Sequence, residues 1–410
     1  MAINRRTMLK GAAAVSALAA PPFIRNAFAE TPIKMGTVFD ITGIFDAYGR
    51  PIDMAVRLAV KQINDAGGLL GRPVEHISYD TQSDMALYTQ YAQQLTRQDN
   101  VDVVHGGILS ASREAIRQTL RRANTLYFYN IQYEGGVCDR NCFVTGVTPA
   151  QTTEVQIPHT MEKWGKTVYI LAADYNYGQL MARWIQKYVG DNGGETLAVE
   201  FFPLDVSDFG STITNIQAAG PDMVYSALVG GPHMSFYRQW AAAGMKDRIP
   251  IASTTLGVGS EHLVLTPEEG NGIVVCYNYS PELDTPANNQ FKAAWAEMHG
   301  ANTVPQIHEL AVSNYQGVML WAEAVKAAGT PDRDAVIDAL EGGLELEGPA
   351  GKVSIDPQTH HATLDVHIME MREQRLDVLE SFASREPIDT QLVCDLIANP
   401  DDNMHYEIDI

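Results

Sequence analysis

The sequence alternates short apolar runs with stretches of helical periodicity along almost its whole length, and this alternation most constrains the fold. Within residues 52–63, apolar residues recur at the spacing of one helix face, and Gly67 and Gly68 then form a typical helix end. Runs such as residues 101–105 and 167–172 are short and apolar, which is typical of buried strands. Strands that alternate with crossover-sized helices favour parallel sheets covered on both faces.

The alternation comes in two rounds that separate near residues 147–149. Three further helical stretches follow between residues 288 and 341. The predicted strands lie at residues 33–39, 74–79, 101–105 and 126–129 in the first round, and at 167–172, 196–202, 223–228, 249–253 and 272–277 in the second. We therefore predict an α/β protein of two doubly wound parallel-sheet lobes, with the late helices returning to the first lobe.

The N-terminus is typical of an export signal. Paired arginines at Arg5 and Arg6 precede a weakly apolar run of about 15 residues, which is short for a membrane helix of about 20. The sequence Ala27-Phe28-Ala29 matches an A-x-A cleavage site. We predict a twin-arginine signal peptide at residues 1–29, cleaved near Ala29, and a periplasmic location. An uncleaved anchor and a chance basic N-terminus are the alternatives.

Composition and motifs exclude several functions. The full chain has a formal net charge of −21, and the predicted signal carries only basic charges, so the exported protein is more acidic still. This charge argues against a nucleic acid partner. Gly106 and Gly107 lack the spacing of a dinucleotide loop, and no hydrolase, zinc-protease or Walker motif is present. We therefore predict no cofactor, no catalytic residues and no enzyme activity.

Cysteine and histidine positions give a further set of expectations. Cys138 and Cys142 flank a polar tripeptide. They could form a small disulfide there or remain two free thiols, and the sequence does not decide between these alternatives. Cys276 lies in an apolar run and is predicted to be a buried free thiol. His360, His361 and His367 form a histidine cluster, of which the pair at 360 and 361 is predicted to lie on the surface in a hairpin, and we predict no metal site.

The candidate ligand-binding residues lie in loops that follow predicted strands. In open parallel sheets, ligands bind beyond the carboxyl ends of the strands. Aromatic, hydroxyl, amide and carboxylate groups in these loops suit a small polar ligand. Ser110 as a simple helix cap and Glu134 as a structural carboxylate are the alternatives. The candidates are Ser110, Tyr129, Gln132, Glu134, Tyr175, Thr254 and Thr255.

These loops resemble those of the type I periplasmic binding proteins, in the branch that binds urea and short-chain amides. The segment at residues 36–43 is similar to the first strand and ligand-side turn of the family, and residues 66–73 are similar to its helix-to-strand link. Narrower similarity lies in Leu109-Ser110-Ala111-Ser112-Arg113, in Tyr129-Asn130-Ile131-Gln132-Tyr133-Glu134-Gly135 and in Asp174-Tyr175. The resemblance covers nearly all of residues 33–385.

The resemblance implies two lobes joined by three hinge crossings, near residues 143–149, 276–280 and 346–351. It places residues 30–147 and 280–347 in the N-terminal lobe, and residues 148–279 and 348–410 in the C-terminal lobe. It further implies that a small polar nitrogen-containing ligand closes the lobes and that the closed form docks on the membrane subunits of an ABC permease. Ser110, Tyr129 and Tyr175 would position the ligand, with further contacts near Gln132.

Two features depart from the urea receptors and leave other ligands open. The sequence Asn176-Tyr177-Gly178-Gln179 replaces an aromatic, proline and arginine of those receptors, and Glu261 follows the Thr254-Thr255 loop late. A larger amide or another small nitrogen compound is therefore an alternative. So are a receptor for branched-chain or other amino acids and a ligand-sensing protein of the amidase-regulator kind with the same fold.

Overall fold

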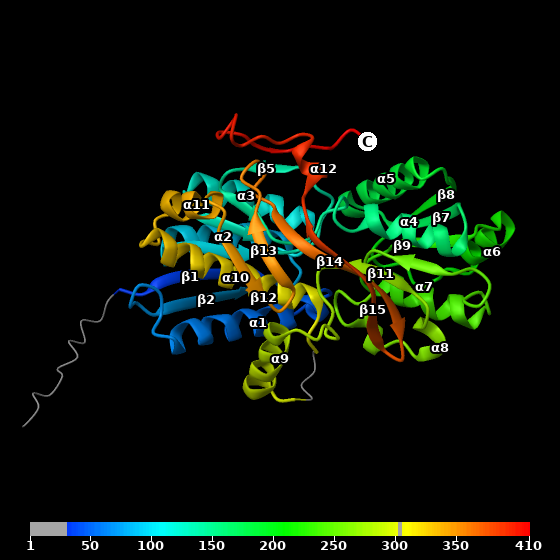
Figure 1. Ribbon diagram of the computed structural model, residues 1–410, viewed down its shortest axis with the longest axis horizontal. Coiled ribbons are helices and arrows are strands. Elements are labelled where there is room, and N and C mark those ends of the chain that lie inside the picture. Colours follow the sequence, from blue (N-terminus) through cyan, green and yellow to red (C-terminus); the bar gives the residue numbers. More distant parts are fainter. Residues whose placement is uncertain (1–30, 302–305) are drawn as a thin grey trace, which may run out of the picture.

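The computed structural model describes residues 31–301 and 306–410 as two α/β lobes side by side (Figure 1). The predicted signal peptide lies outside the described residues. The first lobe contains a parallel sheet in the order β2-β1-β3-β4-β6. Its strands are β1 (Ile33–Phe39), β2 (Val74–Asp80), β3 (Val103–Gly106), β4 (Leu126–Tyr129) and β6 (Cys142–Val144).

Helices cover both faces of this sheet. The apolar face predicted within residues 52–63 is the buried face of α1, with Ile52, Val56 and Ile63 at most 4% exposed. The late helices return to this lobe as predicted, because α9 and α10 pack against α1 and α11 packs against α10. The helices are α1 (Asp46–Asp65), α2 (Met85–Gln94) with the π-helical turn η1 (Leu95–Asp99), α3 (Ser110–Arg122), α9 (Pro286–His299), α10 (Glu309–Ala328) and α11 (Arg333–Glu341).

The second lobe is built on a sheet in the order β12-β13-β14-β11-β10-β9-β7-β8, with β15 paired to β14. Strands β7 to β11 pair in parallel, and β12 to β15 pair antiparallel. The strands are β7 (Thr167–Ala173), β8 (Glu195–Phe202), β9 (Met223–Ala227), β10 (Ile251–Ser253), β11 (Val274–Tyr277), β12 (Glu345–Gly348), β13 (Gly351–Ile355), β14 (Ala362–Arg372) and β15 (Arg375–Arg385). The accompanying helices are α4 (Thr153–Trp164), α5 (Asn176–Asp191), α6 (Gly210–Ala219), α7 (Gly231–Ala242), the short turn η2 (Glu261–Leu263) and α8 (Pro267–Gly270).

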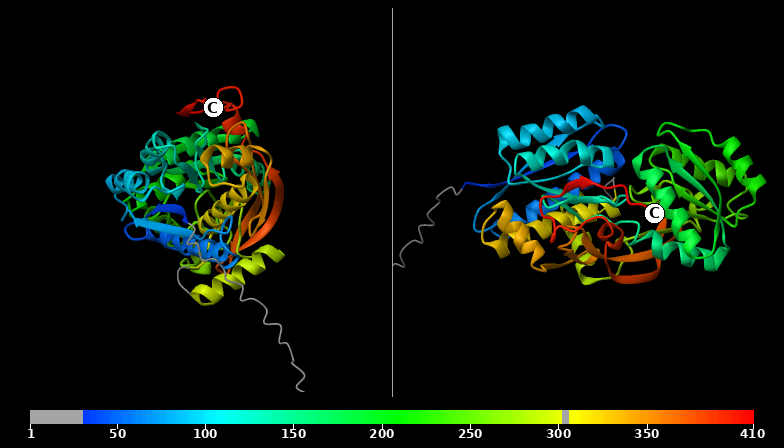
Figure 2. Two further views of the ribbon diagram at one scale, coloured as in Figure 1. Left: turned by 90° about the vertical axis from the view of Figure 1, so that its left-hand side faces the viewer. Right: turned by 90° about the horizontal axis from the view of Figure 1, so that it is seen from above.

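The α/β fold with parallel sheets in two lobes is therefore confirmed, whereas the predicted domain limits stay a prediction. The third connection differs from the expectation at residues 346–351. The β12–β13 hairpin packs against α10 and α11, and β14 continues this ribbon to β11 (Figures 1 and 2). The long strand β14 pairs with β13 on the first-lobe side and with β11 in the second lobe, so its backbone groups stay hydrogen-bonded on both sides of the boundary between the lobes.

The C-terminal segment departs most from the sequence-based expectation. It contains α12 (Ile388–Gln391) and β16 (Asn403–His405), and β16 pairs with β5 (Val137–Asp139) of the first lobe. The expected bridge between Cys138 and Cys142 is wrong, and within the range 348–410 that we expected in the second lobe, β16 pairs with the first lobe. Cys138 forms a disulfide with Cys394, at a Cα–Cα distance of 5.3 Å, and this bond holds the segment on the first lobe.

The other cysteines and histidines are buried. Cys142 and Cys276 are buried free thiols, which confirms the prediction for Cys276. His360 and His361 are at most 1% exposed, so the surface prediction for this pair is wrong. Tyr133 contacts His361, and the His360 ring stacks on Phe143, because the turn before β14 docks into the first lobe. His367 is also buried, at 7% exposure, beside Ser381. None of the described helices is long and apolar enough to cross a membrane.

Candidate functional site

A small cavity lies between the two lobes, at the carboxyl ends of strands from both sheets. Its volume is about 40 Å³. A cavity of roughly 10–15 Å³ holds one water, so this space suits a solute of few atoms. Its lining residues are Tyr48, Ile108, Leu109, Ser110, Tyr129, Ile131, Gln132, Tyr175, Tyr177, Val229, Thr255, Val258 and Leu310.

Five of the seven predicted site residues line this cavity together. Ser110, Tyr129 and Gln132 come from the first lobe, and Tyr175 and Thr255 come from the second. The other two lie just outside the lining. Thr254 borders an adjacent smaller cavity that Gln132 also lines, and Glu134 lies behind Ser110. The structure therefore brings the predicted residues to one place, and their role in binding stays a prediction.

Three helices begin at the cavity without a side-chain cap. The N-cap residues are Leu109 for α3, Tyr175 for α5 and Gly230 for α7, and none of them caps its helix with a side chain. Backbone N–H groups at such helix starts carry partial positive charge and bind oxygen acceptors. Helix starts from both lobes thus provide donors for a carbonyl or carboxylate oxygen.

Unlike the N–H donors of the helix starts, three hydroxyl groups around the cavity are available to a ligand only as acceptors. Ser110 Oγ donates to Glu134 Oε2 at 2.6 Å, and the Tyr129 hydroxyl donates to the Ile108 carbonyl at 2.8 Å. Thr255 Oγ1 donates to the Leu228 carbonyl. A hydroxyl has one proton, so each of these oxygens can only accept a hydrogen bond from a ligand.

Two further polar groups remain at least partly free. The Gln132 amide donates to the Thr254 carbonyl at 3.1 Å through Nε2, which leaves its Oε1 as an acceptor. Among the described residues, no hydrogen bond is found for the Tyr175 hydroxyl, and burial raises its pKa well above the usual value. This hydroxyl therefore keeps its proton and can donate it to a ligand.

The lobes contact each other directly around the cavity. Besides the Gln132–Thr254 contact, Trp184 Nε1 donates to the Glu134 carbonyl at 3.1 Å, and Gly230 N donates to the Tyr48 hydroxyl at 3.3 Å. Each contact joins a first-lobe residue to a second-lobe residue. The described conformation is thus a closed one.

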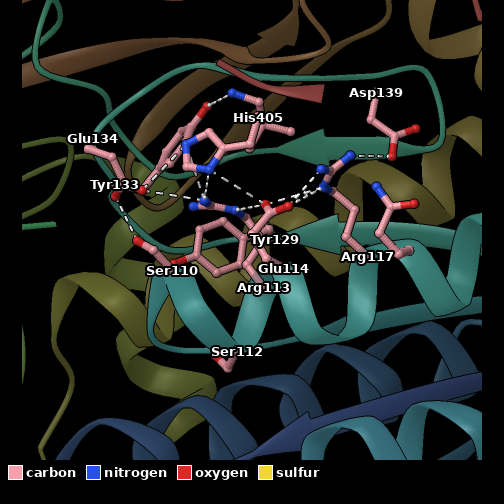
Figure 3. A network of polar contacts seen from close by, with 12 residues as sticks. Ser110, Ser112, Arg113, Glu114, Arg117, Tyr129, Tyr133, Glu134, Asp139 and His405 are labelled. Carbon is pink, nitrogen blue, oxygen red and sulfur yellow. Dashed lines mark hydrogen bonds and ion pairs between the residues drawn. The ribbon is translucent and has the colours of Figure 1, made fainter. Parts of the chain in front are cut away.

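Behind Ser110 lies a fully buried ion pair between Arg113 and Glu134 (Figure 3). Both side chains have 0% exposure, and Arg113 Nη2 lies 3.3 Å from Glu134 Oε1. The guanidinium also lies over the rings of Tyr129 and Tyr133, 5.1 and 4.6 Å from their centres. Burial alone would lower the pKa of Arg113, but Glu134 and the other neighbours outweigh it and raise that pKa.

A sequence model of the family described as periplasmic binding protein matches residues 32–375. The chain belongs to this family. This periplasmic binding protein is 25% identical over 367 residues to the leucine-, isoleucine-, valine-, threonine- and alanine-binding protein of Pseudomonas aeruginosa, covering 87% of this chain and 94% of that protein.

Solved structures resemble this periplasmic binding protein in fold. An amino acid ABC transporter substrate-binding protein of Pseudomonas fluorescens has a TM-score of 0.81 at 22% identity, covering 90% of this chain and all of that one. A solute-binding protein of R. palustris in complex with 4-hydroxybenzoate has a TM-score of 0.78 at 24% identity, covering 87% and 98%.

Sequence reasoning missed several residues of this binding protein's cavity. Tyr177 lies in a loop that was already singled out, so its aromatic ring beside Tyr175 was a usable signal. Tyr48 and Leu310 lie on helices far apart in sequence and gave no such signal. His405 lies beside the Arg113–Glu134 pair, and no local motif marks it. Among the described residues, no cluster of histidine, cysteine or acidic side chains is placed to hold a metal ion.

Proposed function

We propose that this protein is a periplasmic solute receptor that captures a small polar ligand between its lobes and delivers it to the membrane subunits of an ABC permease. The observation that carries this proposal is the closed cavity between the lobes, where helices from both lobes begin uncapped. Family membership and the transport proteins among its relatives support the same role. No enzymatic step is part of the proposal.

The relatives favour an amino acid or another small carboxylate as the ligand. The Pseudomonas aeruginosa relative is named for five amino acids, and the R. palustris structure contains an aromatic acid. The uncapped starts of α3 and α5 suit a carboxylate group. The relatives thus support an amino acid receptor better than they support a urea receptor.

A short-chain amide is the second candidate, because none of the described residues that line the cavity has an acidic or basic side chain. An ammonium or carboxylate group without a charged partner in a closed site has a large desolvation cost. The Ser110, Tyr129 and Thr255 hydroxyls can only accept hydrogen bonds, which suits the N–H groups of an amide. The uncapped helix starts would then bind the amide carbonyl.

We assign direct ligand contacts to five of the predicted residues and indirect roles to two. Glu134 acts through Ser110, whose proton it accepts, and Thr254 acts through Gln132, whose amide it binds. The residues proposed to contact the ligand are Ser110, Tyr129, Gln132, Tyr175 and Thr255.

Ligand stabilisation tests the proposal and separates the two ligand classes. The unfolding of the purified protein is followed with acetamide, urea, L-alanine, L-leucine and 4-hydroxybenzoate, each over a range of concentrations. A solute at 100 times its dissociation constant raises the free energy of unfolding by about 2.7 kcal/mol. Stabilisation by an amino acid but by no amide supports the first candidate, and the reverse supports the second. The absence of stabilisation by any small carbonyl compound would contradict the receptor proposal.

Cell fractionation tests the location. A periplasmic receptor is recovered in the periplasmic fraction with the N-terminus near residue 30, whereas a cytoplasmic ligand sensor keeps the residues before it. Arg5→Lys with Arg6→Lys is expected to keep the protein in the cytoplasm if export uses the twin-arginine route. Lys10→Arg preserves the charge of the same segment and serves as the control.

A further inference from the structure

The end of the chain forms a strap across the first lobe, beyond the family match that ends at residue 375. We call residues Cys394–Ile410 the C-terminal strap; it is the red segment above β5 in Figure 1. The disulfide to Cys138 and the pairing of β16 with β5 attach it to the first lobe. Arg117 donates to the Asn403 carbonyl and Arg121 to the Asp401 carbonyl, both at 2.8 Å.

Two adjacent glycines let the strap approach the loop that follows Tyr133. A Cβ atom on Gly136 would lie 2.0 Å from the carbonyl oxygen of Tyr406, and one on Gly135 would lie 3.1 Å from Ile408 Cδ1. Both glycines have a positive φ, +87° at Gly135 and +94° at Gly136, a backbone conformation that residues with a side chain rarely adopt. The loop that carries Glu134 is thus shaped to receive the strap.

His405 of the strap reaches the buried ion pair (Figure 3). Its Nδ1 lies 3.3 Å from Arg113 Nη2, and its Nε2 lies 3.2 Å from the Gly135 carbonyl. Arginine only donates and a carbonyl only accepts, so the ring accepts at Nδ1 and donates at Nε2. His405 Nε2 also lies 3.6 Å from Glu134 Oε1.

These contacts connect the strap to the cavity in two steps. His405 and Arg113 lie against one carboxylate oxygen of Glu134, and the other oxygen accepts the proton of Ser110. Ser110 Oγ therefore faces the cavity with its lone pairs. If Glu134 turned away, Ser110 could point its proton into the cavity and would repel an N–H group of the ligand.

His405 also covers the Arg113–Glu134 ion pair, whose two charges are both buried. The Arg113 and Glu134 side chains have 0% exposure, and Arg113 Nη1 has no hydrogen-bond partner among the described residues. His405 is 16% exposed and lies against both members of this pair (Figure 3). Removing its ring would admit water beside Arg113 and give Glu134 a competing partner.

We propose that the C-terminal strap supports the ligand site through His405 alone, a positioning residue that holds Glu134 and thereby orients the Ser110 hydroxyl toward N–H donors of the ligand. The Cys138–Cys394 disulfide keeps His405 in place. This inference rests on the proposed function for its effect on binding, but its structural part can be tested without a ligand.

The first experiment compares amide hydrogen exchange of residues 130–136 in unliganded wild type, His405→Ala, His405→Gln and Met404→Ala. Glutamine keeps one acceptor and one donor at this position, and Met404 is an exposed neighbour on β16, at 52% exposure. We expect exchange to be about tenfold faster in His405→Ala, and near the wild-type rate in the other two variants. Wild-type exchange in His405→Ala would overturn the inference.

The second experiment measures by calorimetry the dissociation constants of acetamide and L-alanine for the same variants and for Cys394→Ser. We expect His405→Ala and Cys394→Ser to weaken the bound probe at least tenfold, His405→Gln to restore most of the affinity, and Met404→Ala to leave it unchanged. Equal affinity in wild type and His405→Ala would overturn the inference. If wild type binds neither probe, the ligand assignment of the proposed function fails, and the exchange experiment alone decides the role of His405.

Discussion

Ser110 Oγ lies 2.6 Å from Glu134 Oε2, and this hydrogen bond commits the only proton of a hydroxyl that lines the cavity. Glu134 is in turn held by Arg113 in a fully buried ion pair. The sequence left open whether Glu134 contacts the ligand or has a structural role. In the structure its contacts are with Ser110 and Arg113. Because Glu134 accepts the proton of Ser110, it nevertheless determines that Ser110 can only accept a hydrogen bond from a ligand.

Ser110→Ala should weaken ligand binding much more than it lowers stability. The change removes an acceptor from the cavity, and we expect about a tenfold loss of affinity, equivalent to about 1.4 kcal/mol. Ser112→Ala is a matched control, because Ser112 does not line the cavity itself and its Oγ is used by backbone groups, donating to the Leu109 carbonyl and accepting from Ile108 N. Calorimetry with the solute found by thermal shift measures both. Equal losses of affinity in the two variants would contradict the assignment.

Tyr175→Phe should lower affinity and leave the free energy of unfolding within about 0.5 kcal/mol of wild type. Its hydroxyl lines the cavity and makes no hydrogen bond among the described residues, so phenylalanine removes no protein contact in the unliganded state. Tyr177→Phe provides the contrast, because it breaks a 3.1 Å hydrogen bond to Thr254 and should lower stability by about 1 kcal/mol. Chemical denaturation without ligand distinguishes the two, and a destabilised Tyr175→Phe would contradict a free hydroxyl.

Removal of either half of the Arg113–Glu134 pair should be more damaging than removal of both. Glu134→Gln removes one of the two carboxylates that pair with the buried guanidinium and leaves it only Glu114, whose Oε1 lies 2.9 Å from Arg113 Nε, so we expect a loss of about 1–3 kcal/mol. Arg113→Met combined with Glu134→Gln should recover part of this loss. Denaturation of the two single variants and the double variant gives the coupling free energy. Additive effects would mean that the pair does not act as a unit.

Cys394→Ser should destabilise the protein by about 2–4 kcal/mol, because the disulfide closes a loop across 256 residues of sequence. Cys138→Ser and the double variant should have the same stability as Cys394→Ser. Thermal melting with and without a reducing agent measures this effect, and the reducing agent should change only the wild type. If Cys142→Ser instead lowered the melting temperature without reducing agent, and the reducing agent changed that variant no further, a Cys138–Cys142 bond would be indicated.

The stability of the protein should fall as the pH rises from about 4.5 to 7, in part because of Glu309. Burial raises the pKa of Glu309 to about 7, against a usual value of 4.5, and the hydrogen bond from Ser313 offsets only part of this shift. The native state therefore holds a proton that the unfolded chain has released. The cost at neutral pH is about 3 kcal/mol relative to acidic pH.

Glu309→Gln should remove this contribution. Denaturation at pH 5 and pH 8 should give a smaller difference for the variant than for wild type. Glu323→Gln on the same helix is partly exposed and serves as the control. An unchanged pH dependence in Glu309→Gln would show that Glu309 is ionised at low cost in the native state.

Much of the fold could be predicted because its determinants are local. The apolar spacing within residues 52–63 and the glycines after it predict α1 and its end, and the structure has this helix at Asp46–Asp65. The loops that follow β3, β4 and β7 could be predicted to meet, because the carboxyl ends of parallel strands share one edge. Five of the seven candidate residues line one cavity for this reason.

The rest could not be predicted because it depends on contacts between distant parts of the chain. Cys142 is closer in sequence to Cys138 than Cys394 is, yet the pairing of β16 with β5 brings Cys394 to Cys138. His360 and His361 follow a turn sequence typical of the surface, but that turn packs into the first lobe, where Tyr133 and Phe143 cover the two rings. Local sequence contains no information on what covers a turn.

The sequence by itself determined the two α/β lobes, the edge of the sheets at which a ligand site forms and the residues that provide most of its polar groups, because periodicity and strand order act over short stretches. The tertiary structure alone decided how those groups are oriented. Glu134 faces Ser110 and pairs with the buried Arg113, and His405, which arrives from the opposite end of the chain, lies against both. Hydrogen-bond polarity in a closed site depends on the full set of neighbours of each group, and only the folded chain brings that set together.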